Sequence, residues 1–117
     1  MLITDGIIGL APVPYDKNSE LLFDLLKEQG VIEDRVFSFL VGAKKQRSVF
    51  TIGGYNESYA KTNLTWHNIN QEKHWSLNLM GAEMNNESLL ITVRDVIIDT
   101  GTSLLLMPSF DFYQVIQ

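Results

Sequence analysis

The 117-residue sequence contains no cysteine, only three prolines and few basic residues. The absence of cysteine excludes disulfides, thiolate catalysis and thiolate zinc sites, but it leaves the redox compartment open. Lys and Arg total nine against 14 Asp and Glu, so the net charge is -5 and no nucleic-acid partner is expected. The apolar runs are too short to cross a bilayer, so no membrane span is expected either.

The apolar residues, 45% of the sequence, fall mainly into short β-type segments. Residues 36–41 and 48–52 are rich in β-branched and aromatic side chains. The polar stretch 42–47 between them predicts a hairpin. More strands are expected in the second half, over 64–69, 75–84 and 88–93, with Asn85 and Asn86 as a turn.

One helix is expected in the first half, where four leucines recur at helical spacing: Leu21, Leu22, Leu25 and Leu26. Asn18 or Ser19 is the expected N-terminal cap, and Gly30 suits a left-handed exit. The pattern therefore predicts a short amphipathic helix that ends before Gly30.

Apolar residues continue close to both ends of the sequence. Residues 7–10 are expected in or beside a buried strand, and a second helix is expected after Pro108, with Phe112, Val115 and Ile116 on its apolar side. We therefore expect the sequence to be an excerpt of a longer protein. Triplets of the form Asn-x-Ser/Thr begin at Asn56, Asn63 and Asn86. They fit either N-glycosylation or coincidence in an Asn-rich sequence.

The segment with the clearest chemical content is residues 96–103. Three β-branched residues, 96–98, predict a buried strand that ends at Asp99. A carboxylate there must accept hydrogen bonds, or its pKa must rise. Gly101 allows a tight turn whose N–H can approach the carboxylate, and the hydroxyls of Thr100 and Thr102 can donate. Asp-Thr-Gly alone is also common turn chemistry, so the triplet leaves both interpretations open.

The longer string Ile97-Ile98-Asp99-Thr100-Gly101-Thr102-Ser103 resembles the second catalytic loop of pepsin-like aspartic endopeptidases. Residues 5–11 are similar to the strand-and-glycine segment near the end of that family's N-terminal lobe. Further motifs follow in the family's order and at compatible spacings: Phe37-Ser38-Phe39, residues 50–54, Leu64-Thr65-Trp66 and Trp75. The resemblance covers almost the whole chain.

The resemblance implies an all-β fold with short helices, as a portion of the bilobal pepsin-like acid protease. Residues 1–62 match the end of the N-terminal lobe and the lobe crossing. Residues 63–117 match the start of the C-terminal lobe, which carries the catalytic Asp loop.

The function implied by the resemblance is that of an aspartic-type endopeptidase, a hydrolase that uses two aspartates to activate water and needs no metal or cofactor. Asp99 matches one of these aspartates, supported by Thr100, Gly101 and Thr102. The expected substrate contacts are Ile7, Ile97, Ser103 and His74. Because the sequence contains a single Asp-Thr-Gly, the isolated segment is expected to be inactive.

The implied partners are a protein or peptide substrate and the missing remainder of the same protease chain, in a secreted or an acidic vacuolar or lysosomal compartment. One alternative is a non-catalytic, peptide-binding or structural relative with the same fold. Another is an independent β domain. A homodimer of the retroviral protease type fits less well, because the order of the motifs in this chain is reversed.

Overall fold

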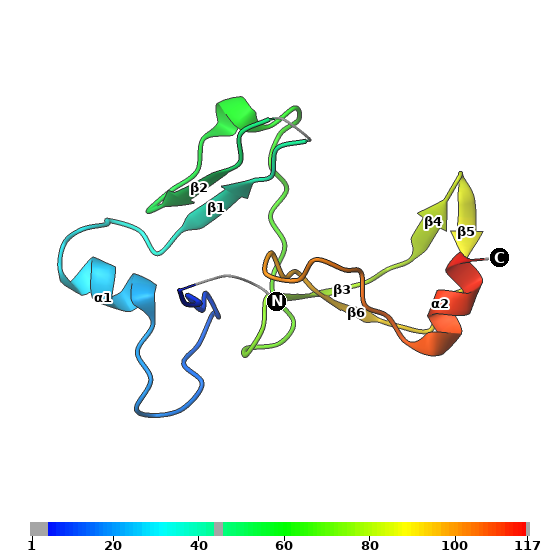
Figure 1. Ribbon diagram of the computed structural model, residues 1–117, viewed down its shortest axis with the longest axis horizontal. Helices are drawn as coiled ribbons and strands as arrows, with labels where there is room; N and C mark the ends of the chain where they lie inside the picture. Colours follow the sequence, from blue (N-terminus) through cyan, green and yellow to red (C-terminus); the bar gives the residue numbers. More distant parts are fainter. Residues whose placement is uncertain (1–4, 44–45, 117) are drawn as a thin grey trace. The chain divides into compact units, whose positions relative to one another are not determined.

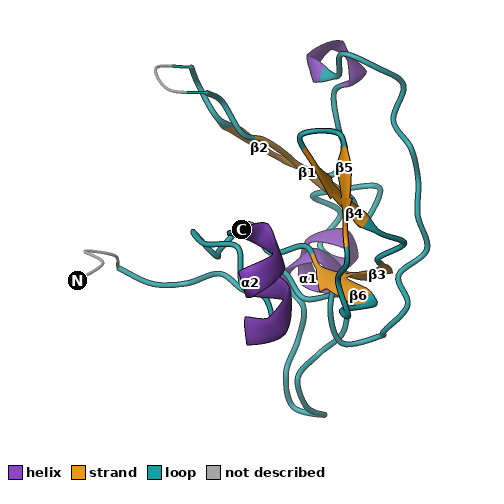
Figure 2. Cartoon of the chain, turned by 90° about the vertical axis from the view of Figure 1, so that its right-hand side faces the viewer, coloured by secondary structure: helices purple, strands orange, loops and turns teal. Residues whose placement is uncertain are grey.

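The computed structural model describes residues 5–43 and 46–116, in which short strands predominate (Figures 1 and 2). In chain order the elements are α1 (Leu22–Glu28), β1 (Phe37–Leu40), β2 (Val49–Ile52), the 3-10 helix η1 (Glu57–Tyr59), β3 (Ser76–Asn78), β4 (Ala82–Met84), β5 (Glu87–Leu89), β6 (Asp95–Ile97) and α2 (Ser109–Val115). The strands form three antiparallel ribbons of two strands each, and none of them closes into a barrel. The predicted β class with short helices is confirmed. None of the described helices is long enough to cross a membrane.

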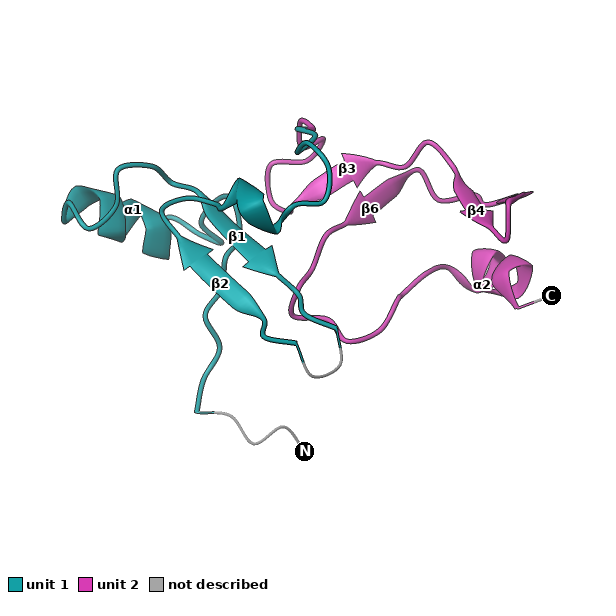
Figure 3. Ribbon diagram, turned by 90° about the horizontal axis from the view of Figure 1, so that it is seen from above, with its two compact units in different colours: residues 1–66 teal, residues 67–117 magenta. Residues whose placement is uncertain are grey.

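The chain divides into two compact units, residues 1–66 and 67–117 (Figure 3). The first unit, hereafter unit 1, contains α1, β1, β2 and η1. The second, unit 2, contains the remaining strands and α2.

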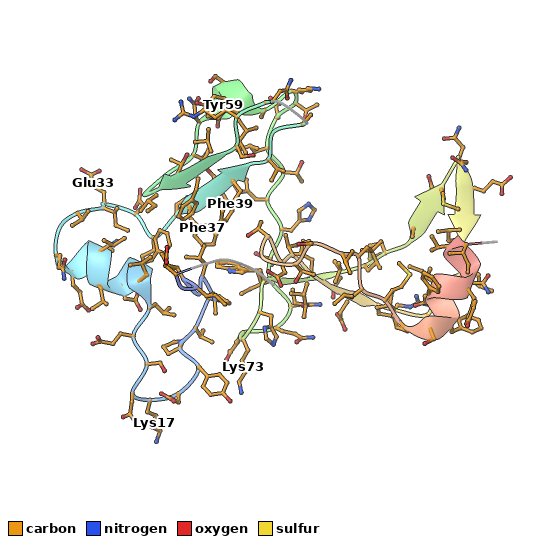
Figure 4. All side chains as sticks on the ribbon, in the orientation of Figure 1. Lys17, Glu33, Phe37, Phe39, Tyr59 and Lys73 are labelled. Carbon is orange, nitrogen blue, oxygen red and sulfur yellow. The ribbon has the colours of Figure 1, made fainter. Side chains whose placement is uncertain are left out.

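The β1–β2 hairpin organises unit 1, and it confirms the hairpin expected from the sequence. Its register runs from Phe37 opposite Ile52 to Leu40 opposite Val49. Two residues of the expected turn, 44 and 45, lie outside the described residues. On β1, Phe37 and Phe39 are labelled in Figure 4.

The apolar core of unit 1 is a cluster of phenylalanine rings around this hairpin. The Phe37 ring lies 5.1 Å from that of Phe23 on α1, and the Phe39 and Phe50 rings stack at 4.7 Å, measured between centroids. Phe23 is 8% exposed and is the buried hydrophobic residue of the described part of the chain. The aromatic residues therefore join the helix to the hairpin.

The C-terminal end of helix α1 agrees with the prediction, whereas its N-terminal end does not. At its C-terminus Gly30 has φ +69°. The Gly30 N–H donates to the Lys27 carbonyl, and the Val31 N–H donates to the Leu26 carbonyl. This is a Schellman motif and confirms the left-handed exit. At the N-terminus the expected cap was wrong. The helix follows Leu21, whose side chain has no polar atom that could accept from the first N–H groups. Ser19 and Asn18 lie two and three residues before Leu21, where the Ser19 hydroxyl and the Asn18 N–H donate to the Asp16 carboxylate.

The β4–β5 hairpin of unit 2 confirms the turn expected at Asn85 and Asn86. These two residues have φ of 54° and 67°, and they connect Met84 to its partner Glu87. Positive φ at both central positions defines a type I′ turn, which asparagine tolerates and which matches the twist of a hairpin.

Other strand predictions were wrong in extent. Residues 64–69 form no strand, and 75–84 is divided into β3 and β4 by residues 79–81. Of the segment 88–93, only its first two residues lie in β5. Where no neighbouring strand supplies hydrogen bonds, a pattern of alternating side chains is not enough to make a strand.

Several apolar segments that the sequence places in a core are exposed. Residues 7–10 form no strand, and Ile7 is 94% exposed. The large apolar side chain of Trp66 is also exposed, at 71%. On α2 the buried residue is Asp111, whereas Phe112 and Ile116 are exposed. In the described residues, ribbons of two strands provide no second layer that could cover these side chains.

Candidate active site

Asp99 lies directly after the last hydrogen bond of the β3–β6 ribbon. Ile97 of β6 is opposite Ser76 of β3, and the Ile98 N–H donates to the Trp75 carbonyl at 2.9 Å. The strand pairing therefore stops one residue before Asp99. The ribbon fixes the backbone direction at the point where the acidic side chain leaves it.

The Asp99 carboxylate accepts a hydrogen bond on each of its oxygens. The Gly101 N–H donates to Oδ1 at 2.8 Å, and the Thr102 hydroxyl donates to Oδ2 at 2.5 Å. The Thr102 N–H also points to the Asp99 carbonyl, at 3.4 Å. The turn formed by residues 99–102, hereafter the Asp99 turn, thus wraps around its own carboxylate.

These donors explain the electrostatics of the site. The hydrogen bond from the Thr102 hydroxyl, followed by that from the Gly101 N–H, lowers the pKa of Asp99 below its ordinary value. The side chain is exposed, so the carboxylate is both ionised and accessible within unit 2. An ionised, accessible carboxylate of fixed orientation can accept a proton from water.

The expected burial of the strand before Asp99 was wrong. Ile97 is 54% exposed, and Ile98 is exposed to a similar extent. In the part of the chain that the structure describes, β6 pairs with β3 alone, and only Val96 of the three β-branched residues is half-buried. The carboxylate is therefore satisfied by its own turn and not by a buried environment.

The remaining predicted site residues are distributed over both units. Thr100 and Ser103 are exposed in the Asp99 turn and just after it. His74 is also in unit 2 and exposed, two residues before β3, where its carbonyl accepts from the Ser76 N–H. Ile7 belongs to unit 1. The structure thus brings Asp99, Gly101 and Thr102 into contact, whereas Ile7 is in the other unit.

A metal centre finds no support in the described ranges 5–43 and 46–116. No group of three or more His, Asp or Glu side chains there could hold a metal ion. The chemistry available at the Asp99 turn is that of a carboxylate and its hydrogen-bond donors.

A match to a family model along nearly the whole chain shows which protein family the chain belongs to. A model described as eukaryotic aspartyl protease matches residues 2–117. The chain belongs to this family. The Asp99 turn lies within the matched residues.

Individual relatives agree with this assignment. The chain is 33% identical to pepsin A of Suncus murinus over 90% of its own length and 28% of that protein. It is 34% identical to pepsin F of Oryctolagus cuniculus over 91% of the chain and 28% of the relative. It is also 32% identical to pregnancy-associated glycoprotein 2 of Bos taurus, over 90% and 29%. The chain spans less than a third of the length of these relatives.

One buried acidic residue of unit 2 was missed in the sequence. Asp111 on α2 is 1% exposed, and its carboxylate receives hydrogen bonds from Thr92 and Val93. An Asp in the first turn of a helix ordinarily interacts with the helix's own free N–H groups. No spacing signal connects position 111 to residues 92–93, so only the folded structure reveals the contact.

Proposed function

We propose that this chain supplies Asp99 as one of the two catalytic aspartates of an aspartic endopeptidase. The observation that carries the proposal is the accessible Asp99 carboxylate, held by the Gly101 N–H and the Thr102 hydroxyl, inside a match to the aspartyl protease family. The second carboxylate would come from sequence outside this chain.

The proposed reaction is hydrolysis of a peptide bond by water. Two close carboxylates share one proton, because a second negative charge beside the first is unfavourable. The ionised group takes a proton from water as its oxygen attacks the peptide carbonyl, and the protonated group donates to the carbonyl oxygen. Breaking of the C–N bond, with proton transfer to nitrogen, then gives an acid and an amine. The preset donors around Asp99 reduce the reorganisation that this charge movement requires.

We assign residues 1–62 to the end of the N-terminal lobe and the lobe crossing, and residues 63–117 to the start of the C-terminal lobe. In this assignment Thr100 joins a hydroxyl network between the lobes. Ile7, Ile97, Ser103 and His74 contact substrate. The exposed apolar side chains at positions 7 and 97 favour bonds flanked by apolar residues.

The proposed partners are a protein or peptide substrate and the remainder of the protease chain, and the proposed location is secreted. The relative pregnancy-associated glycoprotein 2 is a glycoprotein by name. Asn56, Asn63 and Asn86 are exposed, as a glycan requires. Mass spectrometry that detects N-glycan at any of them would support entry into the secretory pathway, and unmodified asparagine at all of them would show that the triplets are coincidental.

The test of the proposed activity is Asp99→Asn in the full protein that carries this chain. Asparagine keeps the size of the side chain but removes the negative charge. Hydrolysis of a denatured protein substrate at acidic pH is expected to fall by at least about 10³-fold, while the unfolding curve changes little. The matched control is Asp95→Asn, which changes an exposed carboxylate on β6 that accepts from the Asn70 amide.

Each outcome bears on one hypothesis. Loss of hydrolysis in Asp99→Asn and its retention in Asp95→Asn would support the proposed role. Retained hydrolysis in Asp99→Asn would contradict it. A wild-type protein that binds peptides without cleaving them would favour the non-catalytic, peptide-binding alternative.

A further inference from the structure

The buried carboxylate of Asp111 makes four contacts to two consecutive residues. The Thr92 and Val93 N–H groups donate to Oδ1 and Oδ2 at 2.7 and 3.0 Å. The Thr92 hydroxyl lies 3.0 Å from Oδ1 and 3.2 Å from Oδ2. We call this set of contacts, made by Asp111, Thr92 and Val93, the Asp111 clamp.

The clamp satisfies a group that would otherwise be costly to bury. Asp111 is 1% exposed, and an unpaired carboxylate in such a place is strongly unfavourable. Burial raises the pKa of Asp111, but the Thr92 and Val93 N–H groups, the Thr92 hydroxyl and the charge of Arg94 outweigh burial and lower it overall. The carboxylate therefore remains ionised into acidic solution.

The clamp and the β3–β6 ribbon hold the two ends of the Asp99 loop, residues 98–108. At its start, the Ile98 N–H is bonded to the Trp75 carbonyl. At its end, the chain enters α2, and Asp111 ties this helix back to the residues just before β6. Figures 1 and 3 show the chain leaving β6 and returning in α2 toward the β4–β5 end of unit 2.

We propose that Asp111 is a positioning residue for the Asp99 turn. It contacts none of the turn itself. It closes the chain from Thr92 to Asp111 into a loop, and this closure restricts the conformations of the segment between its ends. The proposal rests on the proposed function, because a fixed Asp99 has catalytic value only in a working aspartic endopeptidase. Misplacement of a catalytic group by about 1 Å is enough to lower a rate by about 10²-fold.

The test is Asp111→Asn in the full protein, with two readouts. Asparagine has a single acceptor oxygen, so one of the two backbone N–H donors would face the NH₂ group. The first readout is hydrogen exchange of peptides that cover residues 98–105, which include the Gly101 N–H bonded to Asp99. The second is the pH profile of kcat/KM. A loosened turn should weaken the hydrogen bonds that lower the pKa of Asp99, so the acidic limb should move to higher pH.

Asp16→Asn is the matched control. The Asp16 carboxylate also accepts a backbone N–H and a hydroxyl, from Asn18 and Ser19, and its pKa is lowered by the Ser19 hydroxyl and then by the Asn18 N–H. It lies in unit 1, outside the loop closed by the clamp. If Asp111→Asn does not fold, Thr92→Val removes only the hydroxyl donor and keeps the backbone donors.

The expected result is faster exchange over 98–105, a kcat/KM lowered by roughly 10- to 100-fold and an acidic limb shifted to higher pH in the clamp variant, with none of these in Asp16→Asn. An active enzyme whose clamp variants lose only melting temperature, with unchanged exchange and pH profile, would overturn the positioning role. An inactive wild type with faster exchange in the clamp variant would overturn the proposed function and leave the clamp's effect on the turn supported. Unchanged exchange over 98–105 would overturn the positioning role of the Asp111 clamp, whether the wild type is active or inactive.

Discussion

The interactions that stabilise unit 1 internally differ in kind from those that stabilise unit 2 internally. In unit 1 the rings of Phe23, Phe37 and Phe50 connect α1 to the hairpin. In unit 2 the two least exposed residues are polar. Asp111, at 1%, accepts from the Thr92 and Val93 N–H groups, whereas the Ser76 hydroxyl, at 0%, has no hydrogen-bond partner among the described residues. The comparison indicates that apolar contact stabilises unit 1 and that the hydrogen bonds of Asp111 stabilise unit 2. The two units should therefore respond differently to mutation and to pH.

The largest effect is expected from Phe23→Ala. Removal of a buried phenylalanine ring takes away its apolar contact and leaves a cavity, so the free energy of unfolding should fall by about 3 kcal/mol, near the low end for such changes because exposed neighbours can collapse inward. Urea denaturation measures this loss. Phe39→Ala on β1 is the control, and it should cost less because Phe39 is 40% exposed whereas Phe23 is 8% exposed.

Hydrogen exchange in the same Phe23→Ala variant would sharpen the comparison. Exchange should accelerate in peptides of residues 5–66 and stay unchanged in those of 67–116, because the aromatic cluster lies within unit 1. Equal acceleration in both units would mean that one cooperative core stabilises them together.

A smaller effect is expected from Gly53→Ala at the end of β2. Gly53 has φ +79°, and a Cβ there would lie 2.9 Å from Cγ2 of Ile32. Left-handed backbone and this close contact together predict a loss of about 1–2 kcal/mol in the free energy of unfolding. The control is the neighbouring Gly54→Ala, where the added methyl group meets no atom within 4 Å. Equal melting temperatures for the two variants would contradict the explanation.

The smallest expected effect is a pH dependence of stability that arises in unit 2. Because the pKa of Asp111 is lower in the folded protein than the ordinary value of about 3.9, its contribution is complete above that value and is lost as pH falls through the folded-state pKa. The difference in melting temperature between wild type and Asp111→Asn should therefore be largest at neutral pH and should disappear in strong acid. The difference for Phe23→Ala should not depend on pH. If wild type and Asp111→Asn still differ in melting temperature at low pH, the charge of Asp111 is not the source of the stabilisation.

Local sequence signals predicted the features of the fold that depend on a few neighbouring residues. The β1–β2 hairpin, the Asn85-Asn86 turn and the Gly30 exit all follow from turn chemistry and side-chain type. The Asp99 turn follows from its motif, since Gly101 and Thr102 are close to Asp99 in sequence.

Features that depend on distant segments could not be predicted in this way. Burial of Asp111 requires Thr92 and Val93, which lie 19 and 18 residues away, respectively. The burial expected at Ile97 was wrong because hydrophobicity indicates a preference for burial, whereas actual burial depends on a second layer that ribbons of two strands do not supply. The predicted N-cap of α1 was wrong because the helix begins after Leu21, two residues beyond Ser19.

The most direct measurement is kcat/KM for peptide hydrolysis at acidic pH by the full protein, compared between wild type and Asp99→Asn. If Asp99 is a catalytic carboxylate, the variant should fold normally and lose at least about 10³-fold of the wild-type value. A folded Asp99→Asn variant that hydrolyses the peptide at the wild-type rate would show that Asp99 is only a turn residue.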